Sequence, residues 1–129
     1  MKYEELTLLI IEVFNKVYRI LGYGFLEKVY VKAMCFEFEN RGIKYINEFP
    51  VNVIYEGRIA GEYVADFIIE DKVVVEIKAI RELFSSDERQ LLNYLRCTDK
   101  EVGLLLNFGE KPQIRRKVYD NELKKKYLD

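Results

Sequence analysis

Two charged residues lie two positions apart in the most apolar stretch of this 129-residue chain. Glu76 and Lys78 belong to the segment VVVEIKAI, residues 73–80, and their spacing puts both side chains on one face of a β-strand. An unpaired ion in such a strand costs several kcal/mol, so each charge needs an opposite charge, a metal ion or a shifted pKa. The two residues could form an ion pair with each other, or they could belong to a site that performs chemistry.

Three further polar residues are candidates for the same site. Asp66 lies among apolar residues in the preceding predicted strand. Glu27 shares an apolar helical stripe with Tyr30, and a carboxylate on such a stripe is seldom there only for solvation. Gln90 lies one helical turn before Tyr94. Structural roles remain open for two of them, because Glu27 could cap its helix or pair with a residue of the sheet, and Gln90 could simply be exposed.

The turn between the two predicted strands decides whether Asp66 meets Glu76. A three-residue turn, Glu70–Lys72, pairs Ile69 with Val73 and places Asp66 opposite Glu76. A two-residue turn, Asp71–Lys72, points Asp66 to the other face of the sheet unless a β-bulge restores the count. A shared site requires the first arrangement or a bulge.

The composition limits the chemistry that the chain can perform. There is no histidine, which excludes Ser-His and Cys-His nucleophile pairs and His-ligated zinc. The two cysteines, Cys35 and Cys97, cannot form a four-thiolate metal site and are expected to be reduced residues of a cytoplasmic protein. Three carboxylates make an all-oxygen site, which suits Mg²⁺ or Mn²⁺, and a nearby lysine can stabilise negative charge on a phosphoryl group. These residue types predict metal-dependent phosphodiester hydrolysis.

The hydrophobic pattern predicts one domain of residues 1–129, in the α/β or α+β class. Two N-terminal helices are expected at residues 4–21 and 25–40, a sheet with a crossover helix at residues 44–119, and a basic, frayed tail at residues 120–129. Strands are expected at residues 45–55, 58–70, 73–80, 101–108 and 113–119, and the crossover helix at residues 85–97. Pro50 predicts an edge or bent first strand. Ser85 is the expected N-cap of the crossover helix, with Glu88 completing a capping box.

These motifs together resemble a known family. Residues 24–30 read G-x-x-E-x-x-Y, and they occur with Asp66, the triplet Glu76-Ile77-Lys78, QLLNY at 90–94 and VGLLLNFG at 102–109. This combination resembles the small bacterial and archaeal GxxExxY family, which is assigned to the PD-(D/E)XK nuclease-like superfamily. The resemblance covers nearly the whole chain. It implies a restriction-endonuclease-like core with a mixed five-stranded sheet flanked by helices.

The resemblance also assigns expected roles to individual residues. It implies that Glu27, Asp66, Glu76 and the backbone carbonyl of Ile77 hold Mg²⁺ or Mn²⁺. It further implies that Lys78 is the catalytic lysine, acting with Asp66 and Glu76, and that Gln90 orients water or substrate. Two positions depart from the family pattern: Ala65 replaces the proline of the superfamily name, and Asp87 replaces a histidine found in many members. Asp87 could add a carboxylate to the site or cap the helix.

The expected function is therefore hydrolysis of nucleic acid, with DNA favoured over RNA. The alternative is a non-catalytic module that keeps the nuclease fold and binds nucleic acid or protein. The residues expected to contact nucleic acid are Tyr30, Tyr94, Arg115, Arg116 and Lys117. No apolar run approaches the length of a membrane span, and a domain this small could act as a homodimer or with a partner protein.

Overall fold

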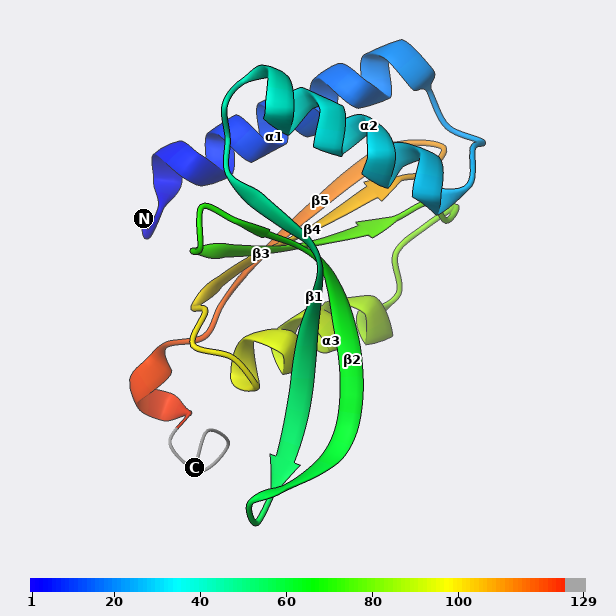
Figure 1. Cartoon of the computed structure of the whole chain (residues 1–129). Helices are drawn as coiled ribbons and strands as arrows, with labels where there is room; N and C mark the ends of the chain where they lie inside the picture. The colour runs from blue at the N-terminus through cyan, green and yellow to red at the C-terminus, as the bar shows by residue number, and fades with distance from the viewer. Residues whose placement is uncertain (125–129) are drawn as a thin grey trace.

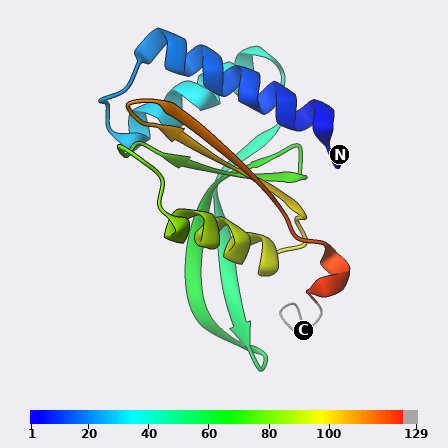
Figure 2. The ribbon, with the colours of Figure 1, turned by 180° about the vertical axis from the view of Figure 1, so that it is seen from behind.

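A mixed sheet of five strands, in the order β1-β2-β3-β4-β5, organises the chain (Figure 1). The computed structural model describes residues 1–124. The elements are, in chain order, α1 (Glu4–Leu21), α2 (Glu27–Asn40), β1 (Tyr45–Tyr55), β2 (Arg58–Ile69), β3 (Val73–Lys78), α3 (Ser85–Arg96), β4 (Val102–Phe108), β5 (Pro112–Val118) and a 3-10 turn, η1 (Asn121–Leu123). Helices α1 and α2 cover one face of the sheet and α3 covers the other (Figure 1, Figure 2). The predicted mixed five-stranded sheet with flanking helices is confirmed.

The larger core lies between the sheet and the pair α1 and α2. Its centre is aromatic, because Phe108 at the end of β4 stacks on Tyr30 with ring centroids 4.2 Å apart and meets Phe14 at 4.6 Å. All three rings are almost fully buried. A smaller core under α3 contains Leu91, Leu95 and the apolar side chains that the sheet presents to that face.

Of the two turns that the sequence left open between β2 and β3, the strand pairings show the three-residue one, as a shared site requires. Ile69 pairs with Val73, and the N–H of Lys72 donates to the carbonyl of Ile69 at 2.9 Å. Both Glu70 and Asp71 adopt a left-handed backbone, with φ of 51° and 59°. The crossover through α3 makes β3 and β4 parallel, as predicted, and the other neighbouring pairs are antiparallel.

The hairpin of β1 and β2 bends where Glu48 lies opposite Asp66. Glu48 has a φ of 62°. Asn47 pairs with Phe67 and Phe49 pairs with Ala65, but Glu48 and Asp66 between them are not a regular pair. On the sheet side of the bend, Phe67 packs in the core under α1 and α2, whereas Ala65 beyond it packs in the core under α3. Figure 1 shows the outer half of the hairpin leaving the sheet and running past α3. The strand β1 is an edge strand, as Pro50 predicted.

Two helix starts differ from the sequence prediction. Helix α2 begins at Glu27 and not at Phe25, because the left-handed Gly24 and a hydrogen bond from the N–H of Phe25 to the Tyr30 hydroxyl hold the segment outside the helix. The N-cap of α3 is Phe84 and not Ser85. Its N–H donates to the carboxylate of Asp87 at 2.8 Å, so Asp87 caps the helix.

The predicted basic tail begins with an ordered segment. Lys124 is buried and donates hydrogen bonds to the carbonyl oxygens of Thr98 and Lys100. This part therefore docks on the loop before β4 and is not frayed, while residues 125–129 lie outside the described residues. Among residues 1–124, no helix has the length and apolar character needed to cross a membrane.

Candidate functional site

The strands β2 and β3 separate beyond Phe67 and Val75, and we call the gap between Asp66 and Glu76 the notch. The paired residues of these strands end at Phe67 and Val75. Beyond that pair, two carboxylates bridge the strands. The N–H of Asp66 donates to Oε1 of Glu76 at 2.8 Å, and the N–H of Ile77 donates to Oδ2 of Asp66 at 2.7 Å. Asp66 and Glu76 are therefore brought together, as the three-residue turn predicted.

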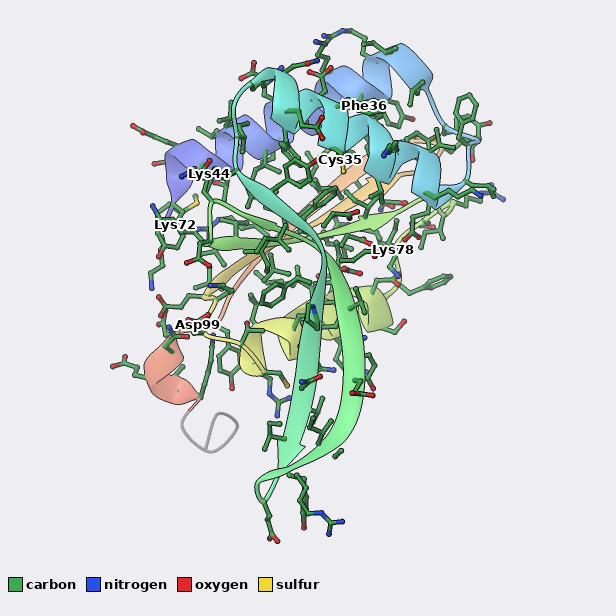
Figure 3. All side chains as sticks on the ribbon, in the orientation of Figure 1. Cys35, Phe36, Lys44, Lys72, Lys78 and Asp99 are labelled. Carbon is green, nitrogen blue, oxygen red and sulfur yellow. The ribbon has the colours of Figure 1, made fainter. Side chains whose placement is uncertain are left out.

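Alternation along β3 sets the direction of Glu76 and Lys78. Val74 packs in the core under α3, and a spacing of two places Glu76 and Lys78 on the same face. Glu76 is buried, with 7% of its surface exposed, and Lys78 is partly buried at the end of the strand. Figure 3 shows Lys78 at the end of β3 opposite to Lys72.

The segment after Lys78 is clamped to β4 and β5. The side chain of Asn107 accepts a hydrogen bond from the N–H of Ile80 at 3.0 Å and donates one to the carbonyl of Ile80 at 2.9 Å. Gln113 receives another hydrogen bond from Asn107 and one from the N–H of Leu83. Gly109 must be a glycine here, because a Cβ would lie 2.4 Å from the carbonyl oxygen of Ile80. The backbone that follows the lysine is therefore fixed.

Electrostatic interactions connect Glu27 with three residues at the notch, namely Asp66, Glu76 and Lys78. Burial, and next the neighbouring Asp66, raise the pKa of Glu76 from 4.5 to about 8. Burial also raises the pKa of Asp66, against the opposing effects of the Ile77 N–H and of Lys78. Partial burial and then Asp66 raise the pKa of Glu27, while Lys78 lowers it. The four ionisable groups, from α2, β2 and β3, thus lie within electrostatic range of one another.

A groove of about 660 Å³ opens beside the notch, between the start of α2 and the strand β1. Glu27 and Asp66 line it together with residues that sequence reasoning missed: Lys28, Lys32, Asn47 and Glu48. Asn47 donates a hydrogen bond to the carbonyl of Asp66 at 2.9 Å. The sequence did contain a signal for Lys28 and Lys32, because residues four apart lie on the same face of a helix and Lys28 follows Glu27 directly. Nothing in the sequence indicated that Asn47 and Glu48 lie next to Asp66.

A family model for the PD-(D/E)XK nuclease superfamily matches residues 4–117. The chain belongs to this superfamily. In the crystal structure of SSO0001, a chain with 19% identity superposes with a TM-score of 0.58, over 74% of this chain and 51% of that chain. The PD-(D/E)XK chain described here thus spans about half the length of SSO0001, and the likeness is one of fold. It supports the expected restriction-endonuclease-like core.

A second solved structure is more distant. It is an alkaline exonuclease, LHK-Exo, from Laribacter hongkongensis, with 13% identity and a TM-score of 0.41, over 95% of this chain and 74% of that chain. No curated protein sequence matches this PD-(D/E)XK chain at a significant level.

The donor set of this candidate site fits a hard divalent cation. Asp66, Glu76 and the carbonyl of Ile77 offer only oxygen ligands, and Mg²⁺ in proteins commonly uses one or two carboxylates and keeps several waters. Burial raises the pKa of both carboxyl groups, and a bound cation would oppose that rise. Within residues 1–124, no three Asp, Glu or Cys side chains cluster closely enough to form a ready metal site, so Glu27 stands apart from the bridged pair.

Gln90 and Tyr94 support the notch from α3. The hydroxyl of Tyr94 accepts a hydrogen bond from Nε2 of Gln90 at 3.2 Å and donates one to the carbonyl of Val64 at 3.4 Å. Burial raises the pKa of Tyr94, and the nearby Glu76 adds to this effect. Tyr94 therefore connects Gln90 of α3 with the bent part of β2 beside the carboxylates.

The structure gives the other expected nucleic-acid contacts different surroundings. Tyr30 is fully buried and its hydroxyl donates to the carbonyl of Gly22 at 2.7 Å. Arg115, Arg116 and Lys117 lie on β5, at the opposite edge of the sheet from β1. Lys117 pairs with Glu88 at 2.7 Å, Arg115 lies 3.8 Å from the same carboxylate, and Arg116 donates to the carbonyl of Lys2. The structure does not bring these residues to the groove of Glu27 and Asp66.

Glu76 should make the metal-free protein less stable as the pH rises. Its pKa of about 8 in the folded chain exceeds the ordinary 4.5, so the folded state binds the proton more tightly than the unfolded state. That stabilisation is complete below about pH 4.5 and is lost as the pH rises through about 8. In EDTA, the Tm of the wild type should therefore fall relative to that of Glu76→Gln between about pH 5 and about pH 8.

Thermal denaturation at a series of pH values checks this prediction. Glutamine at position 76 can still accept the hydrogen bond from the N–H of Asp66, so the fold is kept. Glu62→Gln is the matched control, because Glu62 is an exposed residue of β2. A Tm difference between wild type and Glu76→Gln that stays constant with pH would contradict the raised pKa.

Proposed function

We propose that this chain is a metal-dependent nuclease of the GxxExxY type, which hydrolyses phosphodiester bonds in DNA in preference to RNA. The observation that carries the proposal is the pair of backbone hydrogen bonds that joins Asp66 to Glu76 and Ile77 across the notch, with Glu27 and Lys78 within electrostatic range of these carboxylates. These residue types suit the hydrolysis of a phosphodiester. The carboxylates offer oxygen ligands for a metal ion, and the lysine offers a positive charge for the phosphoryl oxygens.

Each residue of the notch has a distinct role in this proposal. Asp66, Glu76 and the carbonyl of Ile77 would hold Mg²⁺ or Mn²⁺, with Glu27 as an additional acidic group at the groove. The bound ion would lower the pKa of the attacking water and neutralise charge on the phosphate. Lys78 stabilises the negative charge that develops on the phosphoryl oxygens, and the clamp on Ile80 fixes the backbone from which it extends. Gln90 orients the attacking water or the substrate, and its amide donates to Tyr94, which contacts the bend of β2.

A non-catalytic module is the second candidate. One observation favours it: Asp66 and Glu76 already accept hydrogen bonds from backbone N–H groups across the notch. The two carboxylates could then have the purely structural role of joining β2 to β3.

For either candidate function we place the protein in the cytoplasm, because Cys35 and Cys97 are free thiols, which is typical of a reducing compartment. Action as a homodimer or with a partner protein also remains part of the proposal.

A cleavage assay separates the two candidates. End-labelled DNA should be cleaved by the purified chain in Mg²⁺ or Mn²⁺ and should stay intact in EDTA. Lys78→Met should lower the cleavage rate by about 100-fold, the usual loss when one group that stabilises transition-state charge is removed. Lys72→Met is the matched control, because Lys72 is exposed at the other end of β3 (Figure 3) and should leave the rate unchanged. Absence of cleavage in every metal tested would favour the module.

A further inference from the structure

The loop between α1 and α2 presents three large apolar side chains to solvent. Tyr23, Phe25 and Leu26 are 59%, 49% and 68% exposed. Single exposed apolar residues are ordinary, but neighbouring ones that share a groove indicate a binding surface. The proposed chemistry of the notch leaves these side chains without a role.

The loop holds these side chains in a fixed arrangement. Gly22 and Gly24 have φ of 66° and 115°, which residues with a side chain rarely adopt. The buried Tyr30 hydroxyl donates to the carbonyl of Gly22 at 2.7 Å and accepts from the N–H of Phe25 at 3.2 Å. The ring of Phe25 meets that of Tyr30 edge to face, with centroids 6.2 Å apart. The exposed rings are thus presented by a well-anchored backbone.

A groove of about 540 Å³ separates this loop from the segment that follows β3. The loop residues line one part of it, and Ala79, Ile80 and Arg81 line another. Figure 1 and Figure 2 both show the α1–α2 loop, the segment after β3 and the β4–β5 turn at the same end of the sheet. The groove is thus formed by three segments that are distant in the sequence.

This groove adjoins the candidate site. Leu26 lines it and also lines the groove that contains Glu27 and Asp66. On the other side, Ala79 follows Lys78 directly in the chain. A flexible strand lying along Tyr23 and Phe25 would therefore lead to the notch.

The charges of the two grooves favour stacking over phosphate contacts as the source of affinity. Their basic residues are Lys28, Lys32 and Arg81, and their acidic residues are Glu27, Glu48, Asp66 and Glu110. Arg81 is largely exposed and lies 3.4 Å from Glu110. Inside a duplex, the faces of the bases are covered by their neighbours, whereas unpaired bases can stack on aromatic side chains regardless of sequence.

We propose that Tyr23, Phe25 and Leu26, with residues 79–81 opposite them, bind unpaired nucleotides, so that the substrate is a nucleic acid with a single-stranded segment. The inference rests on the proposed nuclease function for the identity of the ligand. The unpaired bases stack on Tyr23 and Phe25, Arg81 contacts the backbone, and the adjoining phosphodiester reaches the notch.

Fluorescence anisotropy with a short labelled single strand and a blunt duplex of the same sequence tests the inference. The measurement uses the full chain in Ca²⁺, and cleavage in Mn²⁺ is followed separately. We expect the wild type to bind the single strand more tightly than the duplex, and Phe25→Ala to weaken single-strand binding about fivefold or more. Phe36→Ala is the matched control, because Phe36 is 53% exposed on α2 and lines neither groove, and it should keep the wild-type affinity.

The outcomes distinguish this inference from the proposed function. If Phe25→Ala binds and cleaves like the wild type, the stacking surface is wrong and the nuclease proposal stands. If single-strand binding depends on Phe25 but no substrate is cleaved, the stacking surface stands and the nuclease proposal fails. If the wild type forms a dimer that Phe25→Ala abolishes, with unchanged strand affinity, the loop is a protein interface and the inference is overturned.

Discussion

The Asp66→Asn variant should cleave no DNA in Mn²⁺ and should take up no manganese in isothermal titration calorimetry. The side-chain oxygen of asparagine can still accept the N–H of Ile77, so the bridge across the notch should persist. What is lost is the negative charge, and a neutral amide is a much poorer ligand for a hard cation than a carboxylate. The expected loss is therefore one of metal affinity and cleavage, with the fold unchanged.

The stability of this variant provides an internal check. Burial raises the pKa of Asp66, which means that its charge is unfavourable in the metal-free fold. Asp66→Asn should therefore have a Tm in EDTA at neutral pH that is equal to or above that of the wild type. Asp99→Asn is the matched control, because Asp99 is exposed and lies far from Lys78 (Figure 3), and it should keep both cleavage and metal uptake. Wild-type cleavage by Asp66→Asn would remove Asp66 from the metal site.

The Phe108→Ala variant should lose about 3 to 5 kcal/mol of unfolding free energy, the usual cost of truncating a buried phenylalanine. The ring is 1% exposed, stacks on Tyr30 at 4.2 Å and meets Phe14 at 4.6 Å. Its removal would open a cavity under both N-terminal helices. Because a domain is stable by only about 5 to 15 kcal/mol, this loss would consume a large part of the total.

Chemical denaturation measures this loss. Phe36→Ala is the control, since Phe36 is 53% exposed and its truncation should change the unfolding free energy by less than about 0.5 kcal/mol. A loss below about 1 kcal/mol in Phe108→Ala would show that the packing around this ring collapses or was loose. The denaturation slope should be compared as well, because a changed slope would indicate a changed unfolded state.

The pairing of Asp66 with Glu76 could be predicted because it depends on short-range features. A spacing of two fixes the common face of Glu76 and Lys78, and only the length of the turn before Val73 was open. The structure has the three-residue turn, so the register follows. Glu27 was singled out from a local pattern, because a carboxylate on an apolar helical stripe is visible in the sequence, and the structure places it in the groove that Asp66 also lines.

The residues that sequence reasoning missed depend on geometry between distant segments. Glu48 reaches the site because the β1–β2 hairpin bends at its left-handed backbone, and no local signal marks that bend. Tyr30 was predicted to contact nucleic acid, yet its stripe faces the sheet and its hydroxyl anchors the α1–α2 loop. The basic run Arg115 to Lys117 shows its charge in the sequence but not its neighbours. In the structure, Arg115 and Lys117 lie beside the carboxylate of Glu88, and Arg116 donates to the backbone carbonyl of Lys2.

In the proposed nuclease, the clamp formed by Asn107 and Gln113 would help to position Lys78 for the phosphate. Because the segment after Lys78 is fastened to two other strands, its backbone is already ordered in the free protein. The backbone next to Lys78 would then lose little conformational entropy when a phosphate binds, and preorganisation of this kind lowers the activation barrier. In the proposed nuclease, β4 and β5 would contribute to catalysis in this way, although they supply no acidic group to the notch.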